Sequence, residues 1–194
     1  MTSNRYLAVG IGVLLIALLA WAVMRSLERI AGVQPAPVEL VVEPSAPPPG
    51  VPRITATLFY GAADADALVA VRREVALAEG TVPQAREILE AQLQSAPEPY
   101  ASVIPEGTAL RAFYTTVRGE AFVDLTPEIA TRHPGGSSTE LLTVYAIVNA
   151  VTANLPTIQR VQILIDGREV DTLAGHVDLR RPLERDFSVV RDGP

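Results

Sequence analysis

Cysteine and lysine are both missing from this 194-residue chain, and each absence narrows the range of functions. Without cysteine the chain has no disulfide, no thiolate metal site, no cysteine nucleophile and no cysteine that a lipid could modify. All sixteen basic residues are arginine, the net charge is −6, and no basic stripe or arginine-rich run occurs. Proteins that bind a phosphate backbone carry such a stripe, so the sequence predicts no nucleic acid partner.

One long hydrophobic run follows a short tail of residues 1–5. Residues 6–24 carry no charge, and as an α-helix they cover roughly 28 Å, enough to span a bilayer. Arg5 and Arg25 flank the run, and their near balance does not decide its orientation. The run predicts one transmembrane anchor that binds the protein to a lipid bilayer. Ala20-Trp21-Ala22 also has the small-x-small pattern that a signal peptidase reads, so cleavage is the alternative.

Residues 25–52 form a predicted linker. Between residues 31 and 52 there are prolines at positions 35, 37, 44, 47, 48, 49 and 52, with only short apolar fragments between them. Proline fixes φ and removes the amide donor, so such a segment favours extended conformations that reach up to about 3.1 Å per residue. The sequence therefore predicts a spacer between the anchor and the domain that follows.

The predicted globular domain occupies residues 53–182, and a tail of residues 183–194 follows it. Apolar residues alternate with period two over 54–60 and again over 69–77, which predicts two strands. Asp64 and Asp66 between them look like the start of a calcium loop. No glycine and glutamate follow at the required spacing, so we interpret both as solvated turn residues. A short amphipathic helix is predicted to follow, with Pro83 in its first turn and Pro97 after its end.

The second half of the domain adds a hairpin, a helix and a strand. Strands over 110–117 and 120–125 have partly apolar faces, and we expect the helices to bury them. A helix is predicted from Ser137, with a capping box in which a serine oxygen and Glu140 each accept a backbone N–H. The strand 161–165 then ends at Asp166-Gly167, a turn favoured in hairpins. The predicted fold class is α+β, with one mixed or antiparallel sheet of about five to six strands covered by two helices and preceded by a transmembrane helix.

No arrangement of residues in the sequence predicts catalysis, a metal site or a cofactor. His133 and His176 are the only histidines, and neither has metal-ligand spacing to the other or to clustered carboxylates. No Gly-x-Ser-x-Gly elbow occurs, and we interpret His176 and Asp178 as surface residues of a late turn. Asn149 could bind a ligand, although a buried amide more often bonds to neighbouring backbone. We therefore predict no catalytic, cofactor-binding or metal-binding residues.

The start of the second helix is the one segment with ligand potential. Free backbone amides at a helix amino terminus attract phosphate or carboxylate groups. Most helix starts that contain glycine and serine are simply capped. The candidate contact for an anion or a partner consists of Gly135, Gly136, Ser137 and Ser138.

The order of these signals resembles the GerMN domain, a family that takes its name from the spore germination and sporulation protein GerM. The resemblance covers the chain from about Ile54 to Leu179. It rests on five segments in order: Ile104-Pro105-x-Gly107-Thr108, Ala121-x-Val123-Asp124-Leu125, Gly136-Ser137 with Glu140-Leu141-Leu142, Ile147-Val148-Asn149-Ala150-Val151-Thr152, and Val161-x-Ile163-x-Ile165-Asp166-Gly167. The resemblance implies a non-enzymatic domain on the extracytoplasmic side of the cytoplasmic (inner) membrane, similar to ring-building modules of envelope assemblies. The chain carries a single copy, so the spore role is not transferred to it.

Two functions remain open from the sequence. The first is protein–protein assembly in the bacterial cell envelope, with other envelope proteins or further copies of this chain as partners. Exposed strand edges would supply the contacts. The alternative is a module that binds peptidoglycan or another glycan. Aromatic residues make up only 5% of the chain, and sugar platforms commonly use exposed rings, which argues against the alternative.

Overall fold

The structure is a computed structural model that describes residues 18, 21–22, 24–25, 50 and 52–191. The chain divides into two units, Met1–Ala46 and Pro47–Pro194, and each is treated by itself. In the first unit the described residues are helical. No helix among the described residues has both the length and the apolar character needed to cross a membrane. Most of the anchor predicted at 6–24 and nearly all of the linker predicted at 25–52 lie outside the described residues.

The first sheet of the second unit is built on one long hairpin. Strand β1 (Arg53–Gly61) pairs antiparallel with β2 (Leu68–Ala76), and the ladder runs without a break from Arg53 opposite Ala76 to Gly61 opposite Leu68. A third strand, β8 (Val190–Arg191), pairs in parallel with the beginning of β2. The period-two pattern thus predicted the first two strands correctly.

The second sheet contains five strands in mixed orientation. Strands β3 (Leu110–Thr115) and β4 (Glu120–Leu125) form an antiparallel hairpin, and β5 (Arg160–Ile165) pairs in parallel with β4. Because β4 and β5 are parallel, the chain must cross over between them. It does so through α3 (Glu128–Thr131) and α4 (Ser137–Asn154). The short strands β6 (Arg168–Glu169) and β7 (Leu183–Glu184) both pair with the other edge of β5.

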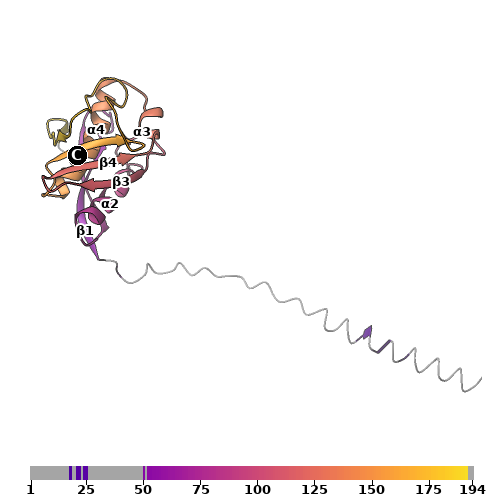
Figure 1. Cartoon of the computed structure of the whole chain (residues 1–194). Helices are drawn as coiled ribbons and strands as arrows, with labels where there is room; N and C mark the ends of the chain where they lie inside the picture. The colour runs from indigo at the N-terminus through magenta and orange to yellow at the C-terminus, as the bar shows by residue number, and fades with distance from the viewer. Residues whose placement is uncertain (1–17, 19–20, 23, 26–49, 51, 192–194) are drawn as a thin grey trace, which may run out of the picture. The chain divides into compact units, whose positions relative to one another are not determined.

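Two helices join the sheets into one domain (Figure 1). Helix α2 (Thr81–Gln92) contacts strands of both sheets, and α4 contacts β1 in one sheet and β5 in the other. The prediction of an α+β fold with a mixed sheet is confirmed, and the five strands of the second sheet agree with the predicted five to six. The separate three-stranded sheet was not predicted. A helix that is apolar on several sides needs partners on more than one side. Helix α4 satisfies this by contacting two sheets, and its buried residues are Glu140, Leu142, Thr143, Val144, Ala146, Ile147, Val148, Asn149, Ala150, Val151 and Thr152.

The outer face of the β3–β4 hairpin differs from its prediction. Phe113 lies in the core with only 3% of its surface exposed, whereas Tyr114 is 59% exposed. Helices α2 and α4 contribute to the core on the side of Phe113. The face of β3 that carries Tyr114 stays exposed, so the prediction that both faces of the hairpin are buried is wrong. Asp166 and Gly167 have φ values of 52° and 74°, which confirms the predicted two-residue turn between β5 and β6.

Residues 183–191, assigned to a tail by the sequence, are part of the folded domain. They supply β7, which pairs with β5, and β8, which pairs with β2. Between these strands the ring of Phe187 stacks on Phe59, with 6.1 Å between the ring centroids. Two-residue strands have no periodicity for a sequence pattern to reveal, because each depends on its partner strand for pairing.

Candidate functional site

The start of α4 holds the candidate contact residues, in the loop that leads from α3. Gly136 is the N-cap, with φ of 92°, and no side chain caps the helix. The amide of Gly135 donates to Nδ1 of His133 at 3.0 Å, so that N–H is already used. Gly136, Ser137 and Ser138 are exposed. The loop reaches the helix with positive φ at two successive glycines, a conformation that other residues rarely adopt.

Glu140 does not form the predicted capping box. Its side chain is fully buried and points to the loop that follows β6. Oε1 accepts the backbone N–H groups of Leu173 and Ala174 at 2.8 and 2.9 Å. Oε2 accepts the backbone N–H of His176 at 2.8 Å and lies 3.1 Å from its Nδ1. Several converging donors stabilise a buried carboxylate better than the single cap amide would, and this explains the difference.

The pKa of the Glu140 carboxyl lies below its ordinary value of 4.5. Burial raises this pKa, but the backbone N–H groups of Ala174, His176, Val177 and Leu173 outweigh that effect. The carboxylate is therefore ionised at neutral pH and serves to hold the loop of residues 171–179 against the start of α4. Its oxygens are occupied by these donors, which makes it a poor general base.

Neither histidine is placed to activate a nucleophile in the described part of the chain. Nδ1 of His133 accepts from Gly135, so Nε2 carries the proton and donates to Oγ1 of Thr143 at 3.2 Å. Burial lowers the pKa of His133, which favours this neutral form. His176 and Asp178 are exposed residues of a late turn, as predicted. Among residues 52–191 and the few described before them, no cluster of three histidine, aspartate or glutamate side chains could hold a metal ion.

The remaining conspicuous carboxylates are engaged by arginine. Nη1 of Arg111 lies 3.1 Å from Oδ2 of Asp124 and 3.0 Å from Oδ1 of Asp166. Oδ1 of Asp124 also accepts the backbone N–H of Gly167 at 2.8 Å. This group joins β3 and β4 to the turn after β5. Asp64 and Asp66 are exposed turn residues, as predicted, and both pair with Arg191 of β8, at 2.8 and 2.9 Å. Both sets of contacts connect distant segments of the domain.

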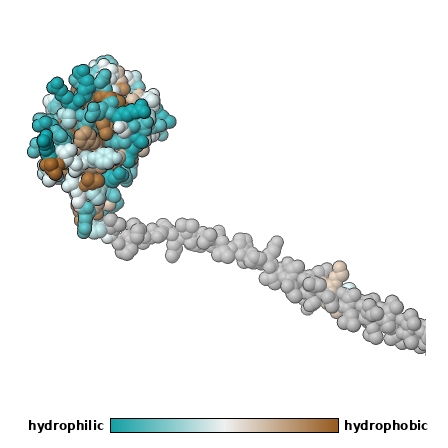
Figure 2. Space-filling view, viewed as in Figure 1, coloured by the Kyte–Doolittle hydropathy of each residue, from teal (hydrophilic) through white to brown (hydrophobic). Residues whose placement is uncertain are grey.

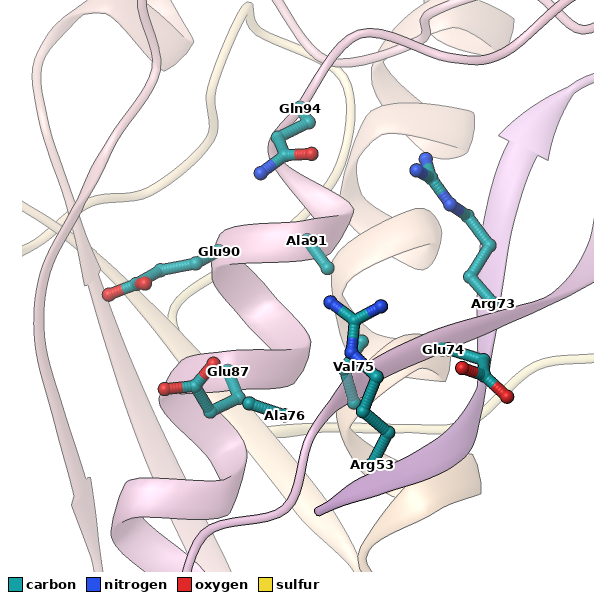
Figure 3. Close-up of a pocket in the computed structure, with 9 residues that line it drawn as sticks. All are labelled: Arg53, Arg73, Glu74, Val75, Ala76, Glu87, Glu90, Ala91 and Gln94. Atoms are coloured by element: carbon teal, nitrogen blue, oxygen red, sulfur yellow. The ribbon is translucent and has the colours of Figure 1, made fainter. Parts of the chain in front are cut away.

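A groove of about 320 Å³ lies between β2 and α2 (Figure 3). In the close-up, the Arg53 side chain extends into the groove, while the carboxylates of Glu87 and Glu90 point away from the Arg53 side chain. The groove is lined by Arg53, Arg73, Glu74, Val75, Ala76, Glu87, Glu90, Ala91 and Gln94. No serine, threonine, histidine or tyrosine is among these residues, so the lining offers no hydroxyl nucleophile and no imidazole base.

Buried and partly buried amide side chains form a second group that the sequence analysis largely missed. Gln92 bonds to both backbone groups of Phe59, at 2.8 and 2.7 Å, and Asn154 bonds in the same way to Thr57. Asn149 exchanges two hydrogen bonds with the backbone of Asp186, which confirms the expected pairing of its amide with backbone. The sequence signal that could have revealed Gln92 and Asn154 is an amide residue near the end of an apolar helical stripe.

The anion hypothesis for Gly135–Ser138 stays a prediction with a direct test. Inorganic phosphate bound at the start of α4 would shift the backbone amide resonances of Ser137 and Ser138, because their N–H groups would donate to it. The measurement is a phosphate titration followed by amide NMR. Resonances of Ser95 and Ser102, which lie outside this segment, serve as the internal reference. Unchanged shifts at Ser137 and Ser138 would end the hypothesis.

The fold and its polar contacts define a class of small α+β domain in which buried polar groups hold segments of the chain together. Among the described residues, every buried side-chain nitrogen or oxygen has a hydrogen-bond partner. The family model described as "Germane: Sporulation and spore germination" matches residues 57–171, which is more than half of the chain. The chain therefore belongs to the Germane family, and the GerMN resemblance drawn from the sequence is confirmed.

Solved structures show the same fold at low sequence identity. A candidate lipoprotein from Clostridium perfringens is 22% identical, with a TM-score of 0.51 over 70% of this chain and 89% of that one. The tandem GerMN domains of the sporulation protein GerM from Bacillus subtilis give 18% identity and a TM-score of 0.54, over 70% of this chain and 46% of that one. The first GerMN domain of GerM alone gives 18% and 0.50, over 69% and 96%. No curated protein matches the chain.

Proposed function

We propose that this protein is a membrane-tethered module of the bacterial cell envelope whose domain lies on the extracytoplasmic side and works by binding other proteins. The observation that carries the proposal is the use of the domain's polar groups. Glu140, Asp124 and the buried amides all bind other parts of the same chain. A domain whose buried polar groups brace its own loops and strands is suited to act as a rigid scaffold.

The membrane tether rests on the sequence and on one structural relative. Residues 6–24 are uncharged over a length that spans a bilayer, and the similar structure from Clostridium perfringens is that of a candidate lipoprotein. These 194 residues contain no cysteine for a lipid, so the apolar run takes the role of the anchor. The proline-rich linker then supplies the distance between the bilayer and the domain.

The proposal is tested by crosslinking in intact cells. The tagged full-length protein is treated with a photoreactive crosslinker that inserts into C–H bonds, because the chain has no lysine for amine-reactive reagents, in the bacterium that encodes it. It is then solubilised in detergent and purified by the tag. We expect crosslinked species above the monomer that contain either envelope proteins or a second copy of the chain. A matched chain that ends at residue 52, which keeps the anchor and linker but has no domain, should lose these species.

Two outcomes would contradict the proposal. Recovery of the monomer alone under all crosslinking conditions would remove the evidence for assembly. Sedimentation of the purified protein with peptidoglycan, together with the absence of protein crosslinks, would favour the glycan-binding alternative. Protease treatment of spheroplasts checks the location, because a domain outside the cytoplasm is digested while the membrane is intact.

A further inference from the structure

The edges of the two sheets differ in how well they are protected. An unpaired strand edge presents backbone N–H and C=O groups that another chain can bind. The outer edge of β1 is closed by three successive pairings. Gly61 exchanges two hydrogen bonds with Ala101, both at 2.8 Å. The amides of Gln92 and Asn154 occupy the backbone groups of Phe59 and Thr57.

The edges of β5 and β2 are also protected against pairing with another strand. Strands β6 and β7 cover the edge of β5 at its two ends. On β2, β8 pairs with the first two residues, and the Gln84 side chain bonds to the carbonyl of Ala76 at 3.0 Å. Between them β2 carries Arg72, Arg73 and Glu74, and charged residues on an edge oppose pairing with another strand.

The edge of β3 has no such protection in the described part of the chain. The amide of Thr116 donates to Glu120 at 2.9 Å, so the backbone groups of Tyr114, two residues earlier, also point to β4. Those of Phe113 and Thr115 consequently point away from β4. Within residues 52–191, no hydrogen bond reaches these outward groups.

Apolar side chains accompany this open edge. Tyr114 is 59% exposed and stands opposite the half-buried Phe122 of β4, and Val117 just beyond β3 is fully exposed. Figure 2 shows hydrophobic residues among hydrophilic ones on the side where β3 and β4 face the viewer. Exposed apolar groups beside unpaired backbone groups are the combination that strand addition uses.

We propose that two copies of this chain associate through β3, antiparallel, with Tyr114 opposite Tyr114 of the second copy. In this register, Phe113 of each copy faces Thr115 of the other. The outward N–H and C=O groups of these residues form four backbone hydrogen bonds across the interface. The two Tyr114 rings become cross-strand neighbours, a favourable pair on a sheet surface.

The charged residues on the two edges favour β3 over β2 as the site of self-association. Arg111 is the only charged residue of β3, and it is already paired with Asp124 and Asp166. With Tyr114 on the two-fold axis, Arg111 lies opposite Val117 of the second copy, so no like charges meet. On β2, antiparallel self-pairing centred on Arg72, Arg73 or Glu74 places that charged residue opposite its own copy. Like charges directly opposite each other are destabilising.

This inference rests on the proposed function, because a shared bilayer would raise the local concentration of the tethered copies. Binding between tethered partners depends on an effective concentration set by the length and stiffness of the linker. A weak edge contact can therefore form in the membrane although it would be sparsely populated in dilute solution.

The inference is tested with single cysteines, since the native chain contains none. Tyr114→Cys places two thiols on the axis, where Cα atoms of directly opposed residues are about 4.5 Å apart, within the range of a disulfide. Arg72→Cys on β2 is the matched control. The full-length variants in membranes are oxidised with copper phenanthroline and separated on non-reducing gels. We expect a disulfide-linked dimer of Tyr114→Cys, at a yield several-fold higher than that of Arg72→Cys.

A second pair of variants removes the edge donor itself. Thr115→Pro deletes an N–H that points away from β4, so it blocks strand addition without breaking the β3–β4 ladder. Arg72→Pro deletes an outward N–H of β2 and serves as control. Resonance energy transfer between donor-tagged and acceptor-tagged copies of the full chain in the same membrane is expected to be lost for Thr115→Pro and kept for Arg72→Pro. Tyr114→Asp, which places like charges on the axis, should give the same loss and does not alter the backbone.

Equal disulfide yields for the two cysteine variants, or a dimer that survives both Thr115→Pro and Tyr114→Asp, would overturn the β3 interface. A native chain that stays monomeric in membranes would also overturn it. If crosslinking in cells then still captures a different envelope protein, the proposed function stands and only self-association fails. If neither species is captured, both proposals fail.

Discussion

Replacement of Glu140 by alanine is expected to lower the free energy of unfolding by about 3–5 kcal/mol, because several donors lose one shared acceptor. The carboxylate accepts the backbone N–H groups of Leu173, Ala174 and His176, and its side chain is fully buried. For a domain of this size, such a loss lowers the melting temperature by roughly 10 °C or more. Thermal unfolding followed by circular dichroism measures it.

The matched control is Glu90→Ala, because Glu90 is exposed on α2 and has no ion pair among the described contacts. Its effect should stay within about 0.5 kcal/mol. Hydrogen exchange adds a local readout, since the amides of Leu173 and Ala174 should lose protection in Glu140→Ala. Similar melting temperatures for the two variants would contradict the structural role of Glu140.

Glu140 should also make the free energy of unfolding depend on pH in the acid range. Its pKa is lower in the folded protein than its ordinary value of 4.5. The stability that comes from this ionised group is therefore complete above that value and is lost as the pH falls through the folded pKa. Chemical denaturation at several pH values should show a smaller loss of stability in acid for Glu140→Gln than for the native protein. Parallel pH profiles would show that another group dominates the acid response.

Replacement of Gln92 by leucine is expected to lower the free energy of unfolding by about 2–5 kcal/mol. The side chain is 1% exposed and occupies both the N–H and the C=O of Phe59. Leucine fills a similar volume but leaves these two backbone groups buried without partners, at about 1–3 kcal/mol each. Urea denaturation measures the loss. Gln94→Leu, the same substitution at an exposed position two residues later, should be nearly neutral.

Gln92→Leu should also change how the protein associates. The amide closes the middle of the β1 edge, and its removal leaves the backbone groups of Phe59 without partners, so that they can pair with another chain when the edge opens locally. We expect concentration-dependent aggregation of Gln92→Leu at temperatures where the native protein and Gln94→Leu remain soluble, measured by light scattering. A variant as stable and as soluble as the native protein would show that the Gln92 contacts contribute little.

Local patterns in the sequence predicted most of the elements, and non-local contacts decided the parts that were missed. The strands of both hairpins, the two main helices and the Asp166-Gly167 turn follow from residue spacing within one segment. The division into two sheets depends on how α4 packs, and β8 depends on pairing with a strand more than a hundred residues away. Neither leaves a periodic signal in its own residues.

The candidate site shows the same limit. Glu140 stands where a capping glutamate is expected, so the local pattern favoured the capping box. Its actual donors lie more than thirty residues later in the chain and become available only when the loop of residues 171–179 folds over α4. The open edge of β3 is equally invisible in sequence, because an edge is defined by the strand that is absent beside it.

The double-sided bonding of β1 has a mechanical consequence. Residues 25–52 join the domain at the beginning of β1, so any tension carried by that segment enters the domain at Arg53. Strand β1 is bonded to β2 along its whole length and, on its other edge, to Gln92, Asn154 and Ala101. These bonds lie across the strand. A pull directed along β1 therefore loads them together in shear rather than one after another, and the strand that receives the load is the one held most completely in place.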